Sequence, residues 1–271
     1  MPLRVGVVEP KPLFPTTRNT IATVYRRIGD AVLNLIYPET CLICSAPVAR
    51  QQDCGVCDSC WEKALNLEIV RPWCPSCGIP FQTFDPGPEH LCSECSRETP
   101  PFSGARSFGY YRAELSRLVQ GLKFEGRKNL SGLLSPLMAQ AFVNSWDHRE
   151  IDLIVPVPLH PTRRRQRGFN QAAVLACGLA RLVGLPCCER ALRRVSATPP
   201  QVGLTDAERV KNVRGAFRCG KPDLVAAKRI LLIDDVMTTG ATVRSACESL
   251  LDGGALRVSV LTLARAVPGI E

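Results

Sequence analysis

Short runs of branched apolar residues recur along the chain, and between them apolar positions return at helical spacing. A run of roughly four to eight such residues suits a strand that is buried on both faces. Strands that alternate with helices are typical of a parallel sheet with helices on its faces. The pattern predicts strands at 105–111, 151–158, 187–195, 230–233 and 256–264.

Helical periodicity fills the segments between these runs. It predicts helices at 112–124, at 130–145, at about 169–183 and from 243 onward. Ahead of them, residues 20–37 carry their apolar side chains on one side of a helical wheel, and we interpret this segment as a packing helix. The sequence therefore predicts an α/β fold whose second half is a doubly wound series of strands and helices.

One predicted strand ends in an unusual way. The apolar run 230–233 is followed by two adjacent acids and then by T-T-G-A-T, ahead of a helical pattern. Ligands of open α/β sheets bind beyond the carboxyl ends of the strands. Free N–H groups at a helix start form a phosphate cradle, and two carboxylates beside it can accept hydrogen bonds from a vicinal diol. This predicts a ribose 5-phosphate site formed by Asp234, Asp235, Thr238, Thr239, Gly240, Ala241 and Thr242.

The main alternative is a Walker B strand, which is also an apolar run that ends in acids. That interpretation requires a phosphate-binding P-loop, and the nearest candidate, G-A-F-R-C-G-K-P at 215–222, fails in two respects. Pro222 replaces the Ser or Thr that would bind Mg²⁺, and too few residues follow Lys221 for the required helix. An ordinary buried strand capped by acids would leave the T-T-G-A-T loop unexplained.

A cationic run follows the first strand of the second half. Arg163, Arg164, Arg165 and Arg167 place four guanidinium groups within five positions. A solvated basic loop would also explain such a run. Because this run follows the carboxyl end of a strand, we expect it at the rim of the phosphate site, where its cations can bind phosphate groups of the ligand. The polar connection 196–216, with Arg209 and Lys211, has the length of an active-site lid.

Paired cysteines dominate the first half. Nine of the 14 cysteines lie between residues 41 and 95, and eight of these form four C-x-x-C pairs separated by 12, 13 and 14 residues. Two such pairs complete one tetrahedral zinc site, so the series predicts about two structural zinc ions. Cys54 could replace Cys60 in the second pair, and a redox function would use one pair at a helix start. The predicted ligands are Cys41, Cys44, Cys57, Cys60, Cys74, Cys77, Cys92 and Cys95.

Charge narrows the range of partners. The 271-residue chain has a net charge of +9, and residues 151–271 hold 18 Lys and Arg against 10 Asp and Glu, an excess of 8. Polyanions are natural partners for this half. No apolar run approaches the roughly 20 residues of a membrane span, and the first residues lack the apolar core of a signal peptide. We expect a cytoplasmic protein without membrane insertion.

The stretch at 230–242 closely resembles the phosphoribosyl pyrophosphate (PRPP) motif of type I phosphoribosyltransferases. The resemblance implies that Asp234 and Asp235 hold the ribose 2′- and 3′-hydroxyls and that the T-T-G-A-T loop holds the 5′-phosphate. It also implies that the loop after the first core strand binds pyrophosphate. In this chain that loop begins with Pro156, Val157 and Pro158.

Further motifs extend the resemblance over about residues 38–265: G-L-K-F-E-G-R at 121–127, R-x-x-R-G-F-N-Q at 164–171 and L-T-x-x-E-R-x-x-N-V-x-G-A-F at 204–217. With the paired cysteines they resemble the ComF family of competence-associated, amidophosphoribosyltransferase-like proteins, which includes the GntX-type members. The implied organisation is a tail and helix at 1–37, a double zinc ribbon at 38–102 and a phosphoribosyltransferase domain at 103–271.

Two functions follow from this resemblance. In the first, PRPP bound with Mg²⁺ loses pyrophosphate through an oxocarbenium-like transition state, and an unknown acceptor attacks the sugar. The second is a competence protein without enzymatic activity that holds single-stranded DNA and uses the PRPP-type fold as a scaffold or sensor. DNA binding commonly adds aromatic stacking platforms. Only 6% of the chain is aromatic, and Phe169 beside the arginine run is the one suggestive position.

Overall fold

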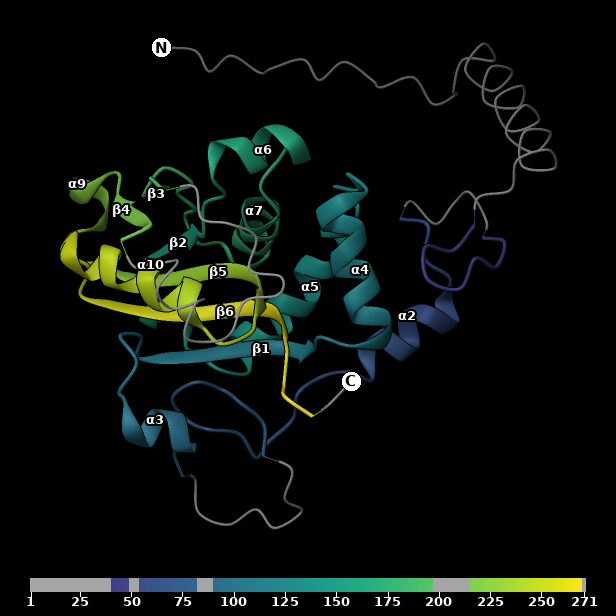
Figure 1. Ribbon diagram of the computed structural model, residues 1–271, viewed down its shortest axis with the longest axis horizontal. Coiled ribbons are helices and arrows are strands. Elements are labelled where there is room, and N and C mark those ends of the chain that lie inside the picture. Colours follow the sequence, from purple (N-terminus) through teal and green to yellow (C-terminus); the bar gives the residue numbers. More distant parts are fainter. Residues whose placement is uncertain (1–39, 49–53, 82–89, 197–214, 270–271) are drawn as a thin grey trace, which may run out of the picture.

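The computed structural model describes residues 40–48, 54–81, 90–196 and 215–269. Its centre is a four-stranded parallel sheet in the order β1-β6-β5-β2 (Figure 1). The strands are β1 (Gly104–Tyr110), β2 (Leu153–Pro156), β5 (Arg229–Met237) and β6 (Arg257–Arg265). These match four of the predicted strands, although β2 is shorter and β5 continues through both acids.

Helices cover both faces of the sheet. α5 (Leu130–Val143) packs against β1 and β6, and α7 (Gln171–Val183) packs against β2 and β5. α4 (Ala113–Phe124) lies beside α5. α10 (Ala241–Asp252) lies on the opposite face, which Figure 1 shows in front. A 3₁₀ turn, η1 (His148–Glu150), leads into β2. The helices predicted at 112–124, at 130–145, at about 169–183 and from 243 onward are confirmed.

The core consists of one hydrophobic cluster on each face of the sheet. Along β5, Leu231 and Ile233 belong to the cluster with α4, α5 and α7, whereas Ile230 and Leu232 belong to the cluster with α10. All four side chains are inaccessible to solvent. This is why the sequence of a central parallel strand shows a continuous apolar run and not an alternating pattern.

The strand expected at 187–195 is reduced to a short segment outside the main sheet. β3 (Leu192–Arg194) pairs in antiparallel fashion with β4 (Phe217–Cys219) in a separate two-stranded sheet. At the start of the predicted strand, Cys187 forms an isolated parallel bridge with Ile154 of β2. A four-residue helix, α9 (Pro222–Val225), follows β4. The predicted strand is therefore present only as the short β3, and it does not join the main sheet; only Ala191 and Leu192 of the segment 187–195 are buried.

The arginine run also differs from the prediction. It forms a helix, α6 (Pro161–Arg167), where the sequence analysis expected a loop. Pro161 occupies the first turn, where its missing N–H costs no hydrogen bond. The His160 side chain caps the helix by accepting a hydrogen bond from the N–H of Thr162 at 3.3 Å. No residue of α6 is buried, so apolar periodicity could not reveal it.

The cysteine-rich segment packs directly onto the sheet. α2 (Asp58–Leu65) contacts α4, and α3 (Ser93–Arg97) ends shortly before β1 (Figure 1). Between the two helices, Ile69 donates its N–H to the carbonyl of Phe108, and Tyr110 donates to the carbonyl of Leu67. The segment 67–69 therefore covers the free edge of β1. Both hydrophobic clusters contain residues of the cysteine-rich segment.

Several sequence predictions fall on residues that the structure does not describe. The helix at 20–37 lies outside the described residues, as do residues 197–214, most of the predicted lid. Within the described ranges, no helix combines the length and the apolar character that a membrane crossing requires.

Candidate functional site

The carboxyl ends of β2 and β5 open into a cavity of about 970 Å³. Its walls come from five segments that lie far apart in the sequence: Tyr111 with the end of α4, the loop after β2, α6 with the start of α7, Arg194 of β3, and the end of β5 with the loop and helix start that follow it. This is the position at which parallel α/β sheets bind their ligands. The cavity is therefore the candidate site.

The T-T-G-A-T loop forms the floor of the cavity. Gly240 has φ +80° and ψ 0°, a left-handed conformation that a side chain would strain, and it is the N-cap of α10. A Cβ atom at Gly240 would lie 2.9 Å from the Met237 methyl carbon, so glycine also permits close packing. Thr239 accepts a hydrogen bond from the N–H of Ala241 at 3.4 Å. The loop and the first turn of a 12-residue helix thus face the cavity together.

The two acids lie beside this loop but differ in their surroundings. Asp235 is 8% exposed and forms an ion pair with Lys123, at 2.9 Å from Oδ1 to Nζ. Asp234 accepts a hydrogen bond from the N–H of Asp235 at 2.8 Å. Lys123 comes from α4, more than 100 residues away in the sequence. A cation thus already neutralises one acid in the absence of ligand.

Burial and charge set the ionisation of these groups. Burial and the neighbouring Asp235 carboxylate raise the pKa of Asp234 to about 7, against the opposing effects of Lys123 and Arg194. Burial disfavours the charged form of Lys123, but the attraction of Asp235 outweighs this and raises the pKa of Lys123 above its ordinary value. Lys123 is therefore a stable cation, whereas Asp234 titrates near neutral pH.

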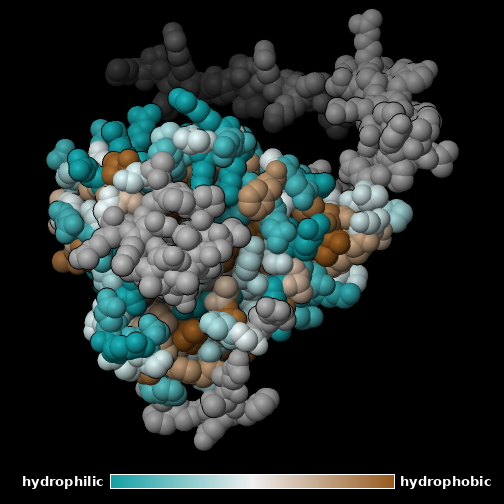
Figure 2. Space-filling view, viewed as in Figure 1, coloured by the Kyte–Doolittle hydropathy of each residue, from teal (hydrophilic) through white to brown (hydrophobic). Residues whose placement is uncertain are grey.

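Three arginines line the wall that faces the acids. Arg163 and Arg167 come from α6, and Arg194 comes from β3. Burial lowers the pKa of Arg167 and of Arg194 below the ordinary arginine value. Arg164 and Arg165 are exposed and do not line the cavity. Figure 2 shows hydrophilic side chains gathered over the α6 edge of the molecule.

The loop after β2 contributes Val157 and Pro158 to the cavity. Pro156 is the last residue of β2, pairs with Ile233 of β5 and does not line the cavity. Asn170 donates its side-chain amide to the carbonyl of Val157 at 3.0 Å and so fixes this loop to the start of α7. The remaining predicted lid residues, Arg209 and Lys211, lie outside the described part of the chain.

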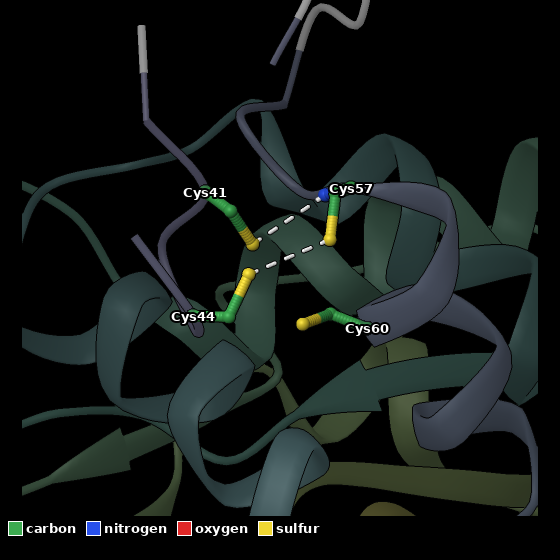
Figure 3. A group of neighbouring side chains, drawn as sticks. All are labelled: Cys41, Cys44, Cys57 and Cys60. Atoms are coloured by element: carbon green, nitrogen blue, oxygen red, sulfur yellow. Dashed lines mark hydrogen bonds between the residues drawn. The ribbon is translucent and has the colours of Figure 1, made fainter. Parts of the chain in front are cut away.

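The eight paired cysteines form two groups of four. In each group the four Sγ atoms lie within 4.8 Å of one another. Figure 3 shows the first group, in which the side chains of Cys41, Cys44, Cys57 and Cys60 converge. Cys44 and Cys57 Sγ are 3.7 Å apart, close to the edge of about 3.8 Å that Zn–S bonds of about 2.3 Å give in a tetrahedron. These groups fit two structural zinc ions.

Backbone donors support the thiolates. Cys41 Sγ accepts from the N–H of Ile43 at 3.4 Å and from that of Cys57 at 3.5 Å. Burial alone would raise the pKa of Cys41, but hydrogen bonds from the backbone of the turn lower it to about 6. In the second group (Cys74, Cys77, Cys92 and Cys95), Cys77 and Cys92 Sγ are 3.6 Å apart.

Known proteins resemble this chain both in its cysteine-rich segment and over most of its length. A double zinc ribbon domain model matches residues 32–96. The DNA utilization protein YhgH of Salmonella typhimurium is 34% identical over 234 residues, which cover 85% of this chain and 99% of that protein. Competence protein F of Haemophilus influenzae is 30% identical over 216 residues, covering 78% of this chain and 91% of that protein.

The chain belongs to the ComF family. Competence protein ComFC of Bacillus subtilis, at 26% identity over 253 residues, is a more distant relative. Among solved structures, the glutamine PRPP amidotransferase from B. subtilis covers 51% of this chain at 24% identity with a TM-score of 0.34. A purine phosphoribosyltransferase from Pyrococcus horikoshii covers 52% at 15% identity with a TM-score of 0.31. Scores of this size do not decide the fold, which follows from the sheet order described above.

Among the cavity residues of this ComF-family chain that sequence reasoning missed are Lys123 and Arg194. The G-L-K-F-E-G-R motif contained Lys123, but nothing in the local pattern distinguished it from an ordinary polar helix position. Arg194 stood within the expected fifth strand. Conversely, the choice between Cys54 and Cys60 is now made. Cys60 belongs to the first group, and Cys54 Sγ donates to the carbonyl of Asn129 at 3.4 Å.

We predict about two zinc ions per chain, because each group supplies four thiolates at tetrahedral spacing. Elemental analysis of freshly purified, reduced protein measures the ratio. Cys44→Ser should lower it by about one, whereas Cys54→Ser should leave it unchanged. A zinc content near zero in the wild-type protein would show that the groups are not metal sites.

The two acids should have opposite effects on the stability of the ligand-free protein. The pKa of Asp234 is raised to about 7 in the fold, so the folded state binds a proton that the unfolded chain has released above about pH 4. Stability is therefore lost as the pH rises through this window. Asp234→Asn should raise Tm relative to the wild type at about pH 8, and the gain should shrink towards about pH 4.

Asp235→Asn should lower Tm near neutral pH, because it removes the partner of a largely buried Lys123. Thermal melts of both variants and the wild type between about pH 4 and pH 8 test the pair. Identical shifts for the two variants would contradict the different environments of the acids.

Proposed function

We propose that this protein binds PRPP with Mg²⁺ in the cavity and transfers the phosphoribosyl group to an acceptor, in the service of the use of external DNA. One observation carries the proposal. A glycine-containing helix start, two adjacent acids and three arginines from distant parts of the sequence line one cavity at the carboxyl ends of parallel strands. These groups match a phosphate, a vicinal diol and a pyrophosphate, respectively.

The 5′-phosphate binds the loop that follows β5. Backbone N–H groups at the start of α10 and the hydroxyls of Thr238, Thr239 and Thr242 donate to its oxygens, and the helix dipole favours its charge. Gly240 and Ala241 let the phosphate approach the backbone. Asp234 and Asp235 accept the ribose hydroxyls at the end of β5, which fixes the orientation of the sugar.

Pyrophosphate occupies the opposite wall. Arg163, Arg167 and Arg194 contribute fixed positive charge where negative charge grows as the bond to the sugar breaks. Val157 and Pro158 shape the wall beside it. Mg²⁺ would accompany the phosphate oxygens of PRPP, as it prefers phosphate and water to a cage of protein ligands. The pyrophosphate role of Arg164 and the lid role of Arg209 and Lys211 remain predictions from the sequence.

Lys123 is the partner of Asp235 before the sugar binds. Its ammonium group forms an ion pair with the Asp235 carboxylate, and a ribose hydroxyl would compete for the same oxygen. Binding of the sugar therefore redistributes the bonds of Asp235 without leaving a bare carboxylate at any stage.

The link to DNA use comes from the relatives. Two of them carry the names DNA utilization protein and competence protein, and each aligns with more than three quarters of this chain. The acceptor of such a transferase is unknown. A screen of candidate acceptors with PRPP, Mg²⁺ and purified protein would identify it. Release of pyrophosphate with any acceptor is the decisive signal for catalysis.

The double variant Asp234→Asn, Asp235→Asn tests the ribose assignment. Each lost charge-assisted hydrogen bond to a ribose hydroxyl should cost roughly 1.5–3 kcal/mol, so PRPP–Mg²⁺ affinity should fall at least tenfold for each acid. Calorimetric titration measures the change.

Asp152→Asn is the matched control. Asp152 forms an ion pair with Arg229 at 2.6 Å at the amino end of the sheet, remote from the cavity. Its loss should affect stability and leave PRPP affinity intact. Tight PRPP binding by the double variant, or no binding by the wild type, would refute the assignment.

A specific observation also favours the second candidate, a protein that holds single-stranded DNA. Arg164 and Arg165 lie on the exposed side of α6, outside the cavity. Phe169 cannot serve as a stacking platform because it is buried. Phe124, in contrast, is 71% exposed at the cavity edge, and the Arg167 guanidinium lies 4.8 Å from its ring centroid. A base could stack there while phosphates follow α6.

Replacement of Arg163, Arg164, Arg165 and Arg167 by Ala should flatten the salt dependence of DNA affinity. If each arginine contacts one phosphate, the slope should fall by up to about three units, because each phosphate contact on single-stranded DNA contributes about 0.7. The slope is measured by titrating labelled single-stranded DNA at several salt concentrations. An unchanged slope would place the DNA site elsewhere, most plausibly on the ribbon.

A further inference from the structure

Arg265 is a buried arginine at the carboxyl end of β6. Its residue is only 5% exposed, and its guanidinium group lies between the second cysteine group and the strand that carries the two acids. Nη1 donates to the carbonyl of Cys77 at 2.7 Å and contacts Met237 Sδ at 3.0 Å. Nη2 lies 3.9 Å from Cys77 Sγ. One side chain thus touches both the ribbon and the end of β5.

A buried guanidinium group requires compensating negative charge. Among the described residues, no carboxylate forms an ion pair with Arg265. Instead, its guanidinium group contacts Cys77 of the second cysteine group. Four thiolates outweigh the two positive charges of a zinc ion, so the loaded site is anionic and serves as the counter-ion of Arg265.

The contact continues from Met237 to the phosphate loop. Met237 is 3% exposed and lies beneath Gly240, since a Cβ atom at Gly240 would come within 2.9 Å of its methyl carbon. The Met237 carbonyl also accepts a hydrogen bond from Ala266 at 3.0 Å. The Met237 side chain therefore packs against the loop 238–242 on one side and contacts Arg265 on the other.

We propose that Arg265 is a positioning residue that couples the second cysteine group to the loop 238–242. With zinc bound at that group, the guanidinium group is compensated and holds Met237 beneath Gly240. Without zinc, the turn that carries Cys77 is no longer held by the metal, so Arg265 loses the acceptors that fix it against Met237, and the loop loses its support. The inference rests on the proposed function only in naming PRPP as the ligand of the loop. The coupling itself is a property of the ligand-free protein.

Arg265→Met tests the coupling, with Arg106→Met as the matched control. Arg106 also ties the sheet to the second cysteine group, through hydrogen bonds from Nη1 to the carbonyls of Pro75 at 3.0 Å and Ala105 at 2.8 Å. These two acceptors lie in the segment of the second cysteine group and in β1, not at the end of β5. Only Arg265→Met should speed hydrogen exchange of the 238–242 amides in the ligand-free protein, by about tenfold or more. Both variants should retain about two zinc ions.

PRPP–Mg²⁺ affinity should fall by about tenfold or more in Arg265→Met, with Arg106→Met close to the wild type. Arg265→Lys should restore part of the affinity, because an ammonium group can reach one of the two partners but not both. If wild-type protein fails to bind PRPP, the proposed function falls, and the exchange measurement still decides the coupling.

Zinc removal provides the second half of the test. Chelation of zinc from reduced wild-type protein should loosen the 238–242 amides, whereas in Arg265→Met it should add little, since the two changes act through one contact. Independent, additive effects would overturn the proposal, as would wild-type exchange rates in Arg265→Met or equal loosening in Arg106→Met. If Arg265→Met does not fold, Met237→Leu decides: it must loosen the same amides, and unchanged exchange overturns the proposal.

Discussion

A parallel sheet must be covered on both faces and at its edges, and this constraint organises the whole molecule. Its backbone groups and apolar strands tolerate little contact with water. Helices α5 and α7 cover one face, and α10 covers the other. The sheet has only four strands, and β1 is at one edge. The cysteine-rich segment covers this edge, because residues 67–69 form hydrogen bonds with β1.

This arrangement explains why each cysteine group packs behind a different part of the cavity wall. Leu42, beside the first group, packs against Gly121 of α4, where a Cβ atom would come within 2.6 Å. Two residues later α4 presents Lys123 to Asp235. The second group contacts Arg265 and, through it, the base of the phosphate loop. The ribbon is thus part of the scaffold of the site, and its core is continuous with that of the sheet.

Local sequence was sufficient to predict the structure wherever all the residues of a motif lie in one segment of the chain. The apolar run with two acids and T-T-G-A-T identified β5 and the start of α10, and the C-x-x-C spacing identified both cysteine groups. It was insufficient wherever partners meet only in the fold. Lys123 is one polar position on an amphipathic helix, and its meeting with Asp235 depends on how α4 packs. Burial was likewise invisible: Phe169 looked like an exposed platform and is part of the core.

The antiparallel contact at residues 67–69 has a consequence for the behaviour of the protein in solution. An uncovered parallel sheet edge is a template on which a second chain can add a strand. Here the cover is a segment between two cysteine groups, one of which starts five residues later at Cys74. Metal loss that loosens this segment would free the N–H of Tyr110 and the carbonyl of Phe108 together. The zinc-loaded ribbon thus keeps the β1 edge covered and prevents self-association through it. Aggregation would therefore be an early sign of zinc loss.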